Sequence, residues 1–219
     1  MFSGITQGLF PVSLLLKREG LFRYAIDLNE NLIKDLKVGA SVAIDGVCQT
    51  VVNIDGLTVS FDAMSETLAA TTLGALDIDK KVSVERSLRL GEEIGGHEVA
   101  GHVFEQAIII GRRELTDHVS LSIQCSDGCF AFIKPRGFVA IDGSSLTVAA
   151  LSKKSKSFEV YIIPETLRVT NFVNKGVGSR VNLEPDMKVV ALVEAVQASL
   201  ADIQTRVDRI EKKLRYVIN

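Results

Sequence analysis

The ten residues VAIDGVCQTV (42–51) occur a second time as VAIDGSSLTV (139–148), offset by 97 and identical at seven positions. Three further pairs occur in the same order along the chain, with offsets of 97 or 99: FSGIT (2–6) with VAGHV (99–103), ETLAATTL (66–73) with ETLRVTNF (165–172), and VSVER (82–86) with VNLEP (181–185). Four ordered matches indicate two copies of one domain, about 1–88 and 98–187, joined by LRLGEEIGG.

Each copy has the pattern of an all-β domain. Short runs rich in Val, Ile and Thr alternate with turn signals, and Ile-Asp-Gly occurs at 44–46, 54–56 and 141–143. Asp-Gly favours tight hairpin turns, because Gly tolerates positive φ and Asp bonds to its own backbone. A domain of this size with several short strands closes most readily as a small barrel, which removes exposed strand edges. Short helices are expected over 29–39 and 65–76.

From Met187 onward the spacing of apolar residues changes from a period of two residues, typical of strands, to a period of 3.5 residues, typical of a coiled-coil helix. Leu at position a with Ile at position d favours three or four strands over two, so we expect a trimer. Arg206 and Glu211 occupy g and e positions and can pair between parallel helices. The alternative is a helix packed on its own barrel, which usually has a wider apolar stripe. The apolar residues are separated by alternating gaps of four and three: Val189, Val193, Val196, Leu200, Ile203, Val207, Ile210, Leu214 and Val217.

The expected domains are therefore an N-terminal barrel over 1–97, a C-terminal barrel over 98–187 and an oligomerising helix over 188–219. The composition is that of a soluble globular protein, with 47% hydrophobic and 24% charged residues and a net charge of −2. No basic patch favours nucleic acid as a partner, and no apolar stretch is long enough to span a membrane. The first ten residues lack signal-peptide features and only three cysteines occur, so we expect a cytoplasmic location.

Two of the cysteines lie close together in CSDGC (125–129), which could form half of a metal site. The chain has no matching second pair and no histidine at ligand spacing nearby. A strand–turn–strand with both cysteines in the core is therefore favoured, and no metal is expected.

The repeated ten-residue sequences also contain the best candidates for chemistry. Cys48 of the first copy is replaced by Ser145 of the second, and Thr50 and Thr147 follow two residues later. Residues two apart on a strand share a face, so each pair is expected to point toward one pocket or one core. A lone cysteine is more often a small core residue. Repeated polar groups need hydrogen-bond partners, however, and a polar ligand can supply them.

The segment GGHEVAGH contains His97 and His102, and an acidic residue, Asp186, follows the second copy. Gly95 and Gly96 predict an irregular backbone, which allows another part of the chain or a ligand to approach it closely. A histidine pair is more often structural than catalytic, and an acidic residue before a helix usually serves the helix start. These residues are weak candidates when taken alone.

Taken together, eight motifs resemble the riboflavin synthase family, in order and nearly end to end: MFSGI, GASVAIDGVCQTV, SFDAMSETL, VSVER, GGHEVAGHV, IDGSSLTV, IPETLRVTN and VNLE. The resemblance implies two tandem six-stranded closed β-barrels plus a C-terminal α-helix, assembled as a homotrimer. It implies that two molecules of 6,7-dimethyl-8-ribityllumazine react by four-carbon transfer to give riboflavin and 5-amino-6-ribitylamino-pyrimidinedione. No cofactor and no metal is implied, and lumazine synthase is a candidate partner.

The resemblance also assigns site residues. It associates six positions with catalysis: Phe2, Cys48, His102, Ser145, Thr147 and Asp186. In the first copy it assigns substrate binding to Gly4, Ile5, Thr6, Cys48, Gln49, Thr50, Asp62, Ala63, Met64, Ser65, Glu66 and Thr67. In the second copy it assigns substrate binding to Gly101, His102, Val103, Arg136, Ser145, Leu146, Thr147, Tyr161, Ile162, Ile163, Pro164, Glu165 and Thr166.

Three positions depart from the family pattern. Gln49 replaces the usual Leu, Arg136 replaces Lys, and Pro185 stands before Asp186 where an aliphatic residue is usual. The main alternative function is a non-catalytic antenna that binds lumazine or flavin with degenerate second-copy motifs, but these motifs are intact here. A purely structural trimeric β-protein would leave the repeated polar pockets unexplained.

Overall fold

The computed structural model describes the backbone of residues 1–218 and the side chains of residues 1–210. The predicted positions Glu211, Leu214 and Val217 therefore lie outside the described side chains. The chain divides into two compact units, Met1–Asp186 and Met187–Asn219.

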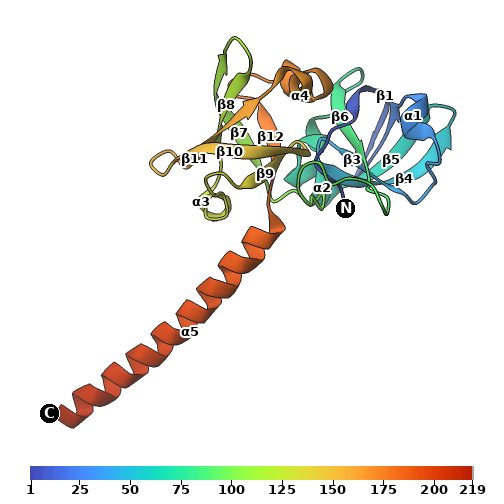
Figure 1. Ribbon diagram of the computed structural model, residues 1–219. Coiled ribbons are helices and arrows are strands. Elements are labelled where there is room, and N and C mark those ends of the chain that lie inside the picture. The colour runs from blue at the N-terminus through green and yellow to red at the C-terminus, as the bar shows by residue number, and fades with distance from the viewer. Residues whose placement is uncertain (219) are drawn as a thin grey trace. The chain divides into compact units, whose positions relative to one another are not determined.

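The first unit contains two closed six-stranded antiparallel barrels, which confirms the predicted all-β duplication and places the barrels side by side (Figure 1). The first barrel closes in the order β1-β2-β5-β4-β3-β6, and the second has the same order, β7-β8-β11-β10-β9-β12. The first barrel consists of β1 (Gly8–Arg18), β2 (Leu21–Asp27), β3 (Ser41–Ile44), β4 (Val47–Asp55), β5 (Thr58–Met64) and β6 (Lys81–Arg86). The second consists of β7 (Glu105–Glu114), β8 (Val119–Gln124), β9 (Phe138–Ile141), β10 (Ser144–Ser152), β11 (Ser157–Ile162) and β12 (Arg180–Pro185).

The two copies of the ten-residue sequence form equivalent hairpins, β3–β4 and β9–β10. Their turns have positive φ at both central residues, 45° and 77° at Asp45 and Gly46, and 45° and 83° at Asp142 and Gly143. This is the turn that Asp-Gly favours and that matches the twist of paired strands. Side chains alternate along β4, with Val47, Gln49 and Val51 buried and Thr50 exposed. Cys48 and Thr50 therefore share a face, as predicted, and the structure shows that it is the outer face of the barrel.

Each barrel has its own apolar core, which includes Tyr24 and Phe61 in the first barrel and Phe158 and Phe172 in the second. A third, smaller cluster lies between the barrels and consists of Phe2, Ala43, Val99 and Ala140, with Cys48 packed against it. The barrels therefore share an apolar contact made by equivalent residues of the two hairpins.

A buried polar network also joins the barrels. Asp45 Oδ1 accepts a hydrogen bond from Asn171 Nδ2 at 2.6 Å, and Asn182 Nδ2 donates to the carbonyl of Asp45 at 2.7 Å. Asp142 pairs with Lys175 in the same region. Burial, and then the negative charge of Asp142, raise the pKa of Asp45 to about 7. This network holds the two hairpin turns together through charged and amide groups that are removed from water.

The predicted short helices are present but differ in length. The segment 29–39 contains only the single turn α1 (Glu30–Ile33), capped by Asn29, because the backbone leaves the helical path at Lys34, with a ψ of 121°, and Asp35 follows with a φ of 59°. The segment 65–76 forms α2 (Ser65–Ala70) and the 3₁₀ turn η1 (Thr72–Ala75). Their counterparts in the second copy are α4 (Pro164–Val169) and η2 (Asn171–Asn174).

The expected strand–turn–strand at CSDGC is wrong. Ser126 caps a one-turn helix, α3 (Asp127–Phe130), through a 3.1 Å hydrogen bond from Cys129 N. Cys125 and Cys129 are both buried, as expected for core cysteines. A Ser side chain that satisfies free N–H groups favours a helix start over a strand turn.

The second unit is one helix, α5 (Met187–Ile218). Its predicted seam is half-buried at Val189 and Val193 and exposed at Val196, Leu200, Ile203, Val207 and Ile210. Among the described residues, no helix combines the length and apolar character needed to cross a membrane.

Candidate functional site

The segments that precede the two barrels cross over, so that each lies against the other barrel. Ser145 N donates to the carbonyl of Gly4 and Cys48 N donates to the carbonyl of Gly101, both at 2.8 Å. Phe2 and Val99 pair as an isolated antiparallel bridge between the two segments. The chain-order grouping of 4–6 with Cys48, and of 101–103 with Ser145, is therefore wrong. The structure groups Gly4 with Ser145, and Gly101 with Cys48.

The two crossing glycines are needed for this close approach. A Cβ at Gly4 would lie 2.6 Å from Cβ of Ser145, and a Cβ at Gly101 would lie 2.7 Å from Cβ of Cys48. Both glycines also have positive φ, 74° and 79°. Any other residue at these positions would be strained and would push the crossing segment off the hairpin.

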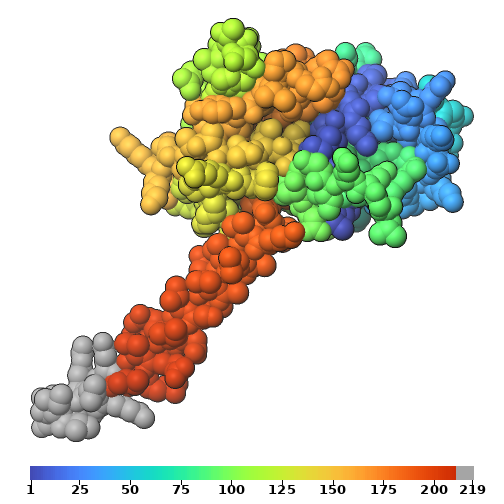
Figure 2. Space-filling view, viewed as in Figure 1, coloured from blue at the N-terminus to red at the C-terminus, as the bar shows by residue number. Residues whose placement is uncertain are grey.

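The second site is a cavity of about 420 Å³ between the crossing segment and the second barrel. In Figure 2 the dark blue N-terminal residues lie against the orange segment that carries α4. Thr6 Oγ1 lies 2.9 Å from Ser144 Oγ, which joins the two walls. The walls combine exposed apolar atoms with hydroxyl groups: Gly4, Ile5, Thr6, Gln7, Ser144, Ser145, Glu165, Thr166, Arg168, Val169 and Thr170.

In the first barrel the corresponding contact joins Cys48 on β4 to the crossing residue Gly101. Cys48 is partly exposed, and Met64, which directly precedes α2, is 67% exposed. Asp62 receives two hydrogen bonds from Arg23, at 2.7 and 2.6 Å. The hydrogen bond from Arg23 lowers the pKa of Asp62, so this carboxylate is charged at neutral pH.

His97 distinguishes the second site from the first. His97 is buried, and its Nδ1 lies 2.6 Å from Oγ of Ser145. Its ring stacks on Phe138 with centroids 5.4 Å apart. Gly96 permits this contact, since a Cβ there would lie 2.5 Å from Cβ of Ser145. His97 lies in the linker that joins the two copies, outside both repeated domains.

Two buried glutamates were missed by the sequence interpretation, although both lie in the repeated pair VSVER and VNLEP. Glu184 accepts hydrogen bonds from Ala100 N at 2.7 Å and Gly101 N at 3.0 Å. Glu85 Oε1 accepts from Ser3 N at 2.7 Å and Ser3 Oγ at 2.8 Å. Burial raises the pKa of Glu85, and it raises the pKa of Glu184 to about 7. The sequence did contain a sign of these buried glutamates, because both copies have an acidic residue at the same place in an otherwise apolar strand.

Several assigned residues lie apart from the cavity walls. Gln49 and Leu146 point into their barrels, where Gln49 Oε1 accepts a hydrogen bond from Tyr24 Oη at 3.1 Å, so only their backbones can face a ligand. Phe2 is fully buried and Asp186 lies between β12 and α5. The side chains of Ala63 and Ile162 are buried in the cores of the first and second barrel. The remaining assigned residues of the two sites are spread over exposed and half-buried positions: Thr50, Ser65, Glu66, Thr67, His102, Val103, Arg136, Thr147, Tyr161, Ile163 and Pro164.

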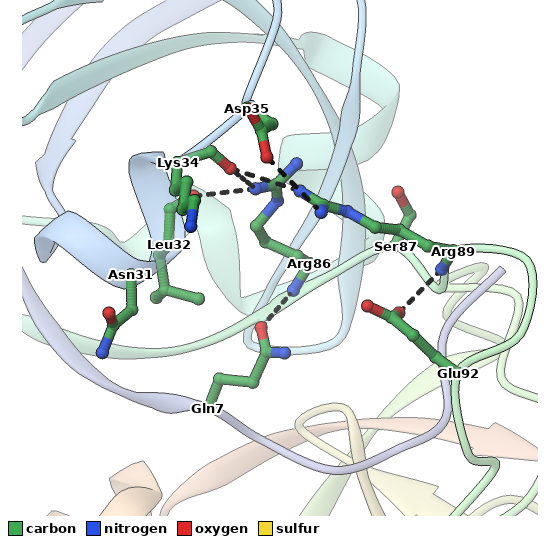
Figure 3. A pocket seen from close by; sticks show the side chains of 9 residues that line it. All are labelled: Gln7, Asn31, Leu32, Lys34, Asp35, Arg86, Ser87, Arg89 and Glu92. Atoms are coloured by element: carbon green, nitrogen blue, oxygen red, sulfur yellow. Dashed lines mark hydrogen bonds and ion pairs between the residues drawn. The ribbon is translucent and has the colours of Figure 1, made fainter.

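A third, polar pocket of about 270 Å³ adjoins the crossing segment at Gln7 (Figure 3). Arg86 Nη1 donates to the carbonyls of Leu32 and Lys34, at 3.1 and 2.7 Å, and Arg86 N donates to Gln7 Oε1 at 2.8 Å. The guanidinium is thus occupied in fixing the loop after α1, and the backbone of Arg86 fixes Gln7.

The cysteine pair at CSDGC has one further residue nearby that could act as a metal ligand, Glu105. The ligand atoms of Glu105, Cys125 and Cys129 lie within 4.8 Å of one another. The hydrogen bond with the Cys125 thiol and burial raise the pKa of Cys129, which keeps it a neutral thiol. The equivalent positions in the first copy are Leu28 and Leu32, both in the core. The cysteines thus occupy apolar core positions of the repeat.

Fold and sites together define a double-barrel protein with two related small-molecule sites, and the chain belongs to the lumazine binding domain family, which it matches over residues 3–87 and again over 100–186. Relatives that the chain matches over most of its length include riboflavin synthases. The riboflavin synthase of Escherichia coli (strain K12) is 38% identical over 203 residues, covering 92% of this chain and 94% of the relative. That of Chlamydia pneumoniae is 38% identical over 201 residues, covering 92% and 98%.

A solved structure shares the fold. The crystal structure of LumP complexed with riboflavin superposes with a TM-score of 0.79 at 24% identity, covering 85% of this chain and 100% of that one. At this identity the likeness concerns the double-barrel architecture.

Proposed function

We propose that this chain is a riboflavin synthase, a transferase that converts two molecules of 6,7-dimethyl-8-ribityllumazine into riboflavin and 5-amino-6-ribitylamino-pyrimidinedione. The single observation that carries the proposal is the presence of two sites of the same design in one chain. Each site places a hairpin residue, Cys48 or Ser145, against a crossing glycine. A reaction between two copies of one substrate requires two such sites.

The walls suit this substrate. A lumazine is a flat heterocycle with imide groups and a polyol chain, and it is recognised by backbone amides, hydroxyl groups and apolar surface more readily than by a charged clamp. The second cavity combines Ile5 and Val169 with the hydroxyl groups of Thr6, Ser144 and Thr166. Both products together contain all the atoms of two substrates, so the transfer needs no external oxidant or reductant.

The chemistry requires removal of a proton from the 7-methyl group of one lumazine and addition of a nucleophile to the other. Ser145 and His97 form the polar pair that can accept or return a proton in the second site. Cys48 and His102 at the first site, and Thr147 beside Ser145 at the second site, serve the remaining steps. Holding both rings together can contribute about 7–11 kcal/mol, so proximity is the main catalytic device.

We further assign the assembly to a homotrimer formed through α5, with a cytoplasmic location and lumazine synthase as the partner that supplies the substrate. The exposed apolar seam of α5 supports self-association, because solvent-exposed Leu and Ile at heptad spacing are stabilised by burial in a coiled coil. In this assembly the first site of one subunit faces the second site of the next.

Incubation of the purified protein with the lumazine tests the function directly. We expect riboflavin absorbance to appear with one pyrimidinedione formed for each riboflavin. Stoichiometric lumazine binding without riboflavin would instead identify an antenna protein, and failure to bind any ribityl heterocycle would contradict both functions.

A further inference from the structure

The buried glutamates Glu85 and Glu184 occupy equivalent positions near the ends of β6 and β12, and each is 4% exposed. Among the hydrogen bonds and ion pairs of the described residues, neither carboxylate pairs with a lysine or an arginine. Each receives instead N–H groups from the crossing segment, Ser3 in one case and Ala100 and Gly101 in the other. A carboxylate that accepts hydrogen bonds from successive backbone amides fixes the path of that backbone.

Each glutamate is therefore linked to the opposite barrel by a short chain of hydrogen bonds through the crossing segment. Ser3, held by Glu85, precedes Gly4, whose carbonyl accepts the bond from Ser145 N in the second barrel. Gly101, held directly by Glu184, accepts the bond from Cys48 N in the first barrel. The carboxylate of one barrel thus sets the position of a wall in the site of the other.

The far end of each crossing segment is fixed by the same strand. Gln7 N donates to the carbonyl of Val84 at 2.8 Å, and Phe104 N donates to the carbonyl of Leu183 at 2.8 Å. In the first copy Arg86 N adds a bond to Gln7 Oε1 (Figure 3). The second copy has proline at the position equivalent to Arg86 and lacks this bond, so its segment depends more on Glu184.

We propose that Glu85 and Glu184 are positioning residues that act across the barrel interface, Glu85 on the second site and Glu184 on the first. This inference rests on the proposed function, because it concerns the walls of the two proposed sites. It adds that substitution of either glutamate weakens ligand binding at the site of the other barrel more than at the site of its own barrel.

The test needs a reporter in each site, and the cysteines provide one. Cys48 is partly exposed whereas Cys125 and Cys129 are buried, so alkylation by iodoacetamide reports on the first site. The double variant Cys48→Ser/Ser145→Cys moves the reporter to the second site. Riboflavin is the probe in both backgrounds, and its concentration for half-maximal protection of the thiol is measured.

Glu184→Gln replaces an acceptor oxygen with an amide group that faces backbone donors, so the concentration for half protection at Cys48 is expected to rise roughly tenfold. Protection at the thiol of the second site is expected to stay within about twofold. Glu85→Gln is expected to give the reverse pattern. Ser3→Ala, which removes only the hydroxyl bond to Glu85, should give a smaller change of the same kind and covers the case in which Glu85→Gln does not fold.

The control is Glu159→Gln on β11, whose carboxylate accepts bonds from Arg113 and Ser120 and lies away from both crossing segments. Its half-protection values should match those of the unmodified protein. If Glu85→Gln and Glu184→Gln each weakened both sites equally, or weakened only the site on the same barrel, this inference would be overturned. The proposed function would stand, because the unmodified protein would still form riboflavin. Failure of the unmodified protein to bind riboflavin would overturn the proposed function and this inference together.

Discussion

Gly46 and Gly143 meet backbone to backbone where the two hairpin turns touch. A Cβ at Gly46 would lie 2.3 Å from the amide nitrogen of Gly143, and one at Gly143 would lie 2.8 Å from Cα of Gly46. The repeated Asp-Gly turn thus has two roles. It closes each hairpin, and it removes the side chains that would keep the barrels apart.

Gly46→Ala is expected to lower the free energy of unfolding by more than about 3 kcal/mol, because strain at a φ of 77° adds to a clash with backbone that cannot move aside. The matched control is Gly56→Ala, where φ is 58° but nothing lies within 4 Å of the added Cβ. Its cost should be only about 1–2 kcal/mol. Urea unfolding measures both values, and equal losses would mean that the turns do not pack tightly.

Stability is expected to fall between about pH 4 and pH 7 through Asp45, whose pKa is raised to about 7 by burial, with Asp142 as the second cause. In this range the folded chain holds a proton at Asp45 that the unfolded chain has released, so raising the pH favours unfolding. Lys175 and Lys80 oppose this effect in part.

Asp45→Asn tests the pH dependence, since the amide keeps an oxygen for the Asn171 and Ser83 bonds but does not titrate. The variant should lose less stability between pH 5 and pH 8 than the unmodified protein, by about 1–3 kcal/mol. Parallel curves for the two proteins would show that Asp45 is already ionised at pH 5.

The sequence alone predicts the duplication, the Asp-Gly turns and the shared face of Cys48 with Thr50 and of Ser145 with Thr147, because these follow from local turn chemistry and from the two-residue period of strands. It does not predict the crossing of 2–6 and 99–103. A repeat shows which copy a residue belongs to, whereas the barrel on which it packs depends on contacts between distant segments. The only local sign is glycine at both crossing points. Glu85 was missed for the same reason, since its partner lies 82 residues away.

Ser145→Ala is expected to lower turnover by about 10²-fold or more while lumazine binding changes little, because the hydroxyl bonded to His97 Nδ1 is lost. His97→Gln should have a similar effect, and the double variant should be no worse than the more damaged single variant, since the two residues act as one unit. Steady-state kinetics on all three proteins measures this. Multiplying effects would indicate that Ser145 and His97 act in separate steps.

Leu200→Glu is expected to convert the full-length protein from a trimer to a monomer, because a buried charge on the seam of α5 is not compensated. Sedimentation equilibrium should show a threefold lower mass. Lumazine binding should persist, because both walls of each site belong to the same chain, but turnover should be lost when neighbouring subunits no longer bring two substrates together. Ala198→Glu is the matched control, since it adds the same charge at the f position, opposite the seam. A Leu200→Glu protein that remains trimeric would show that α5 does not carry the assembly, and a fully active monomer would show that one chain holds both reacting molecules.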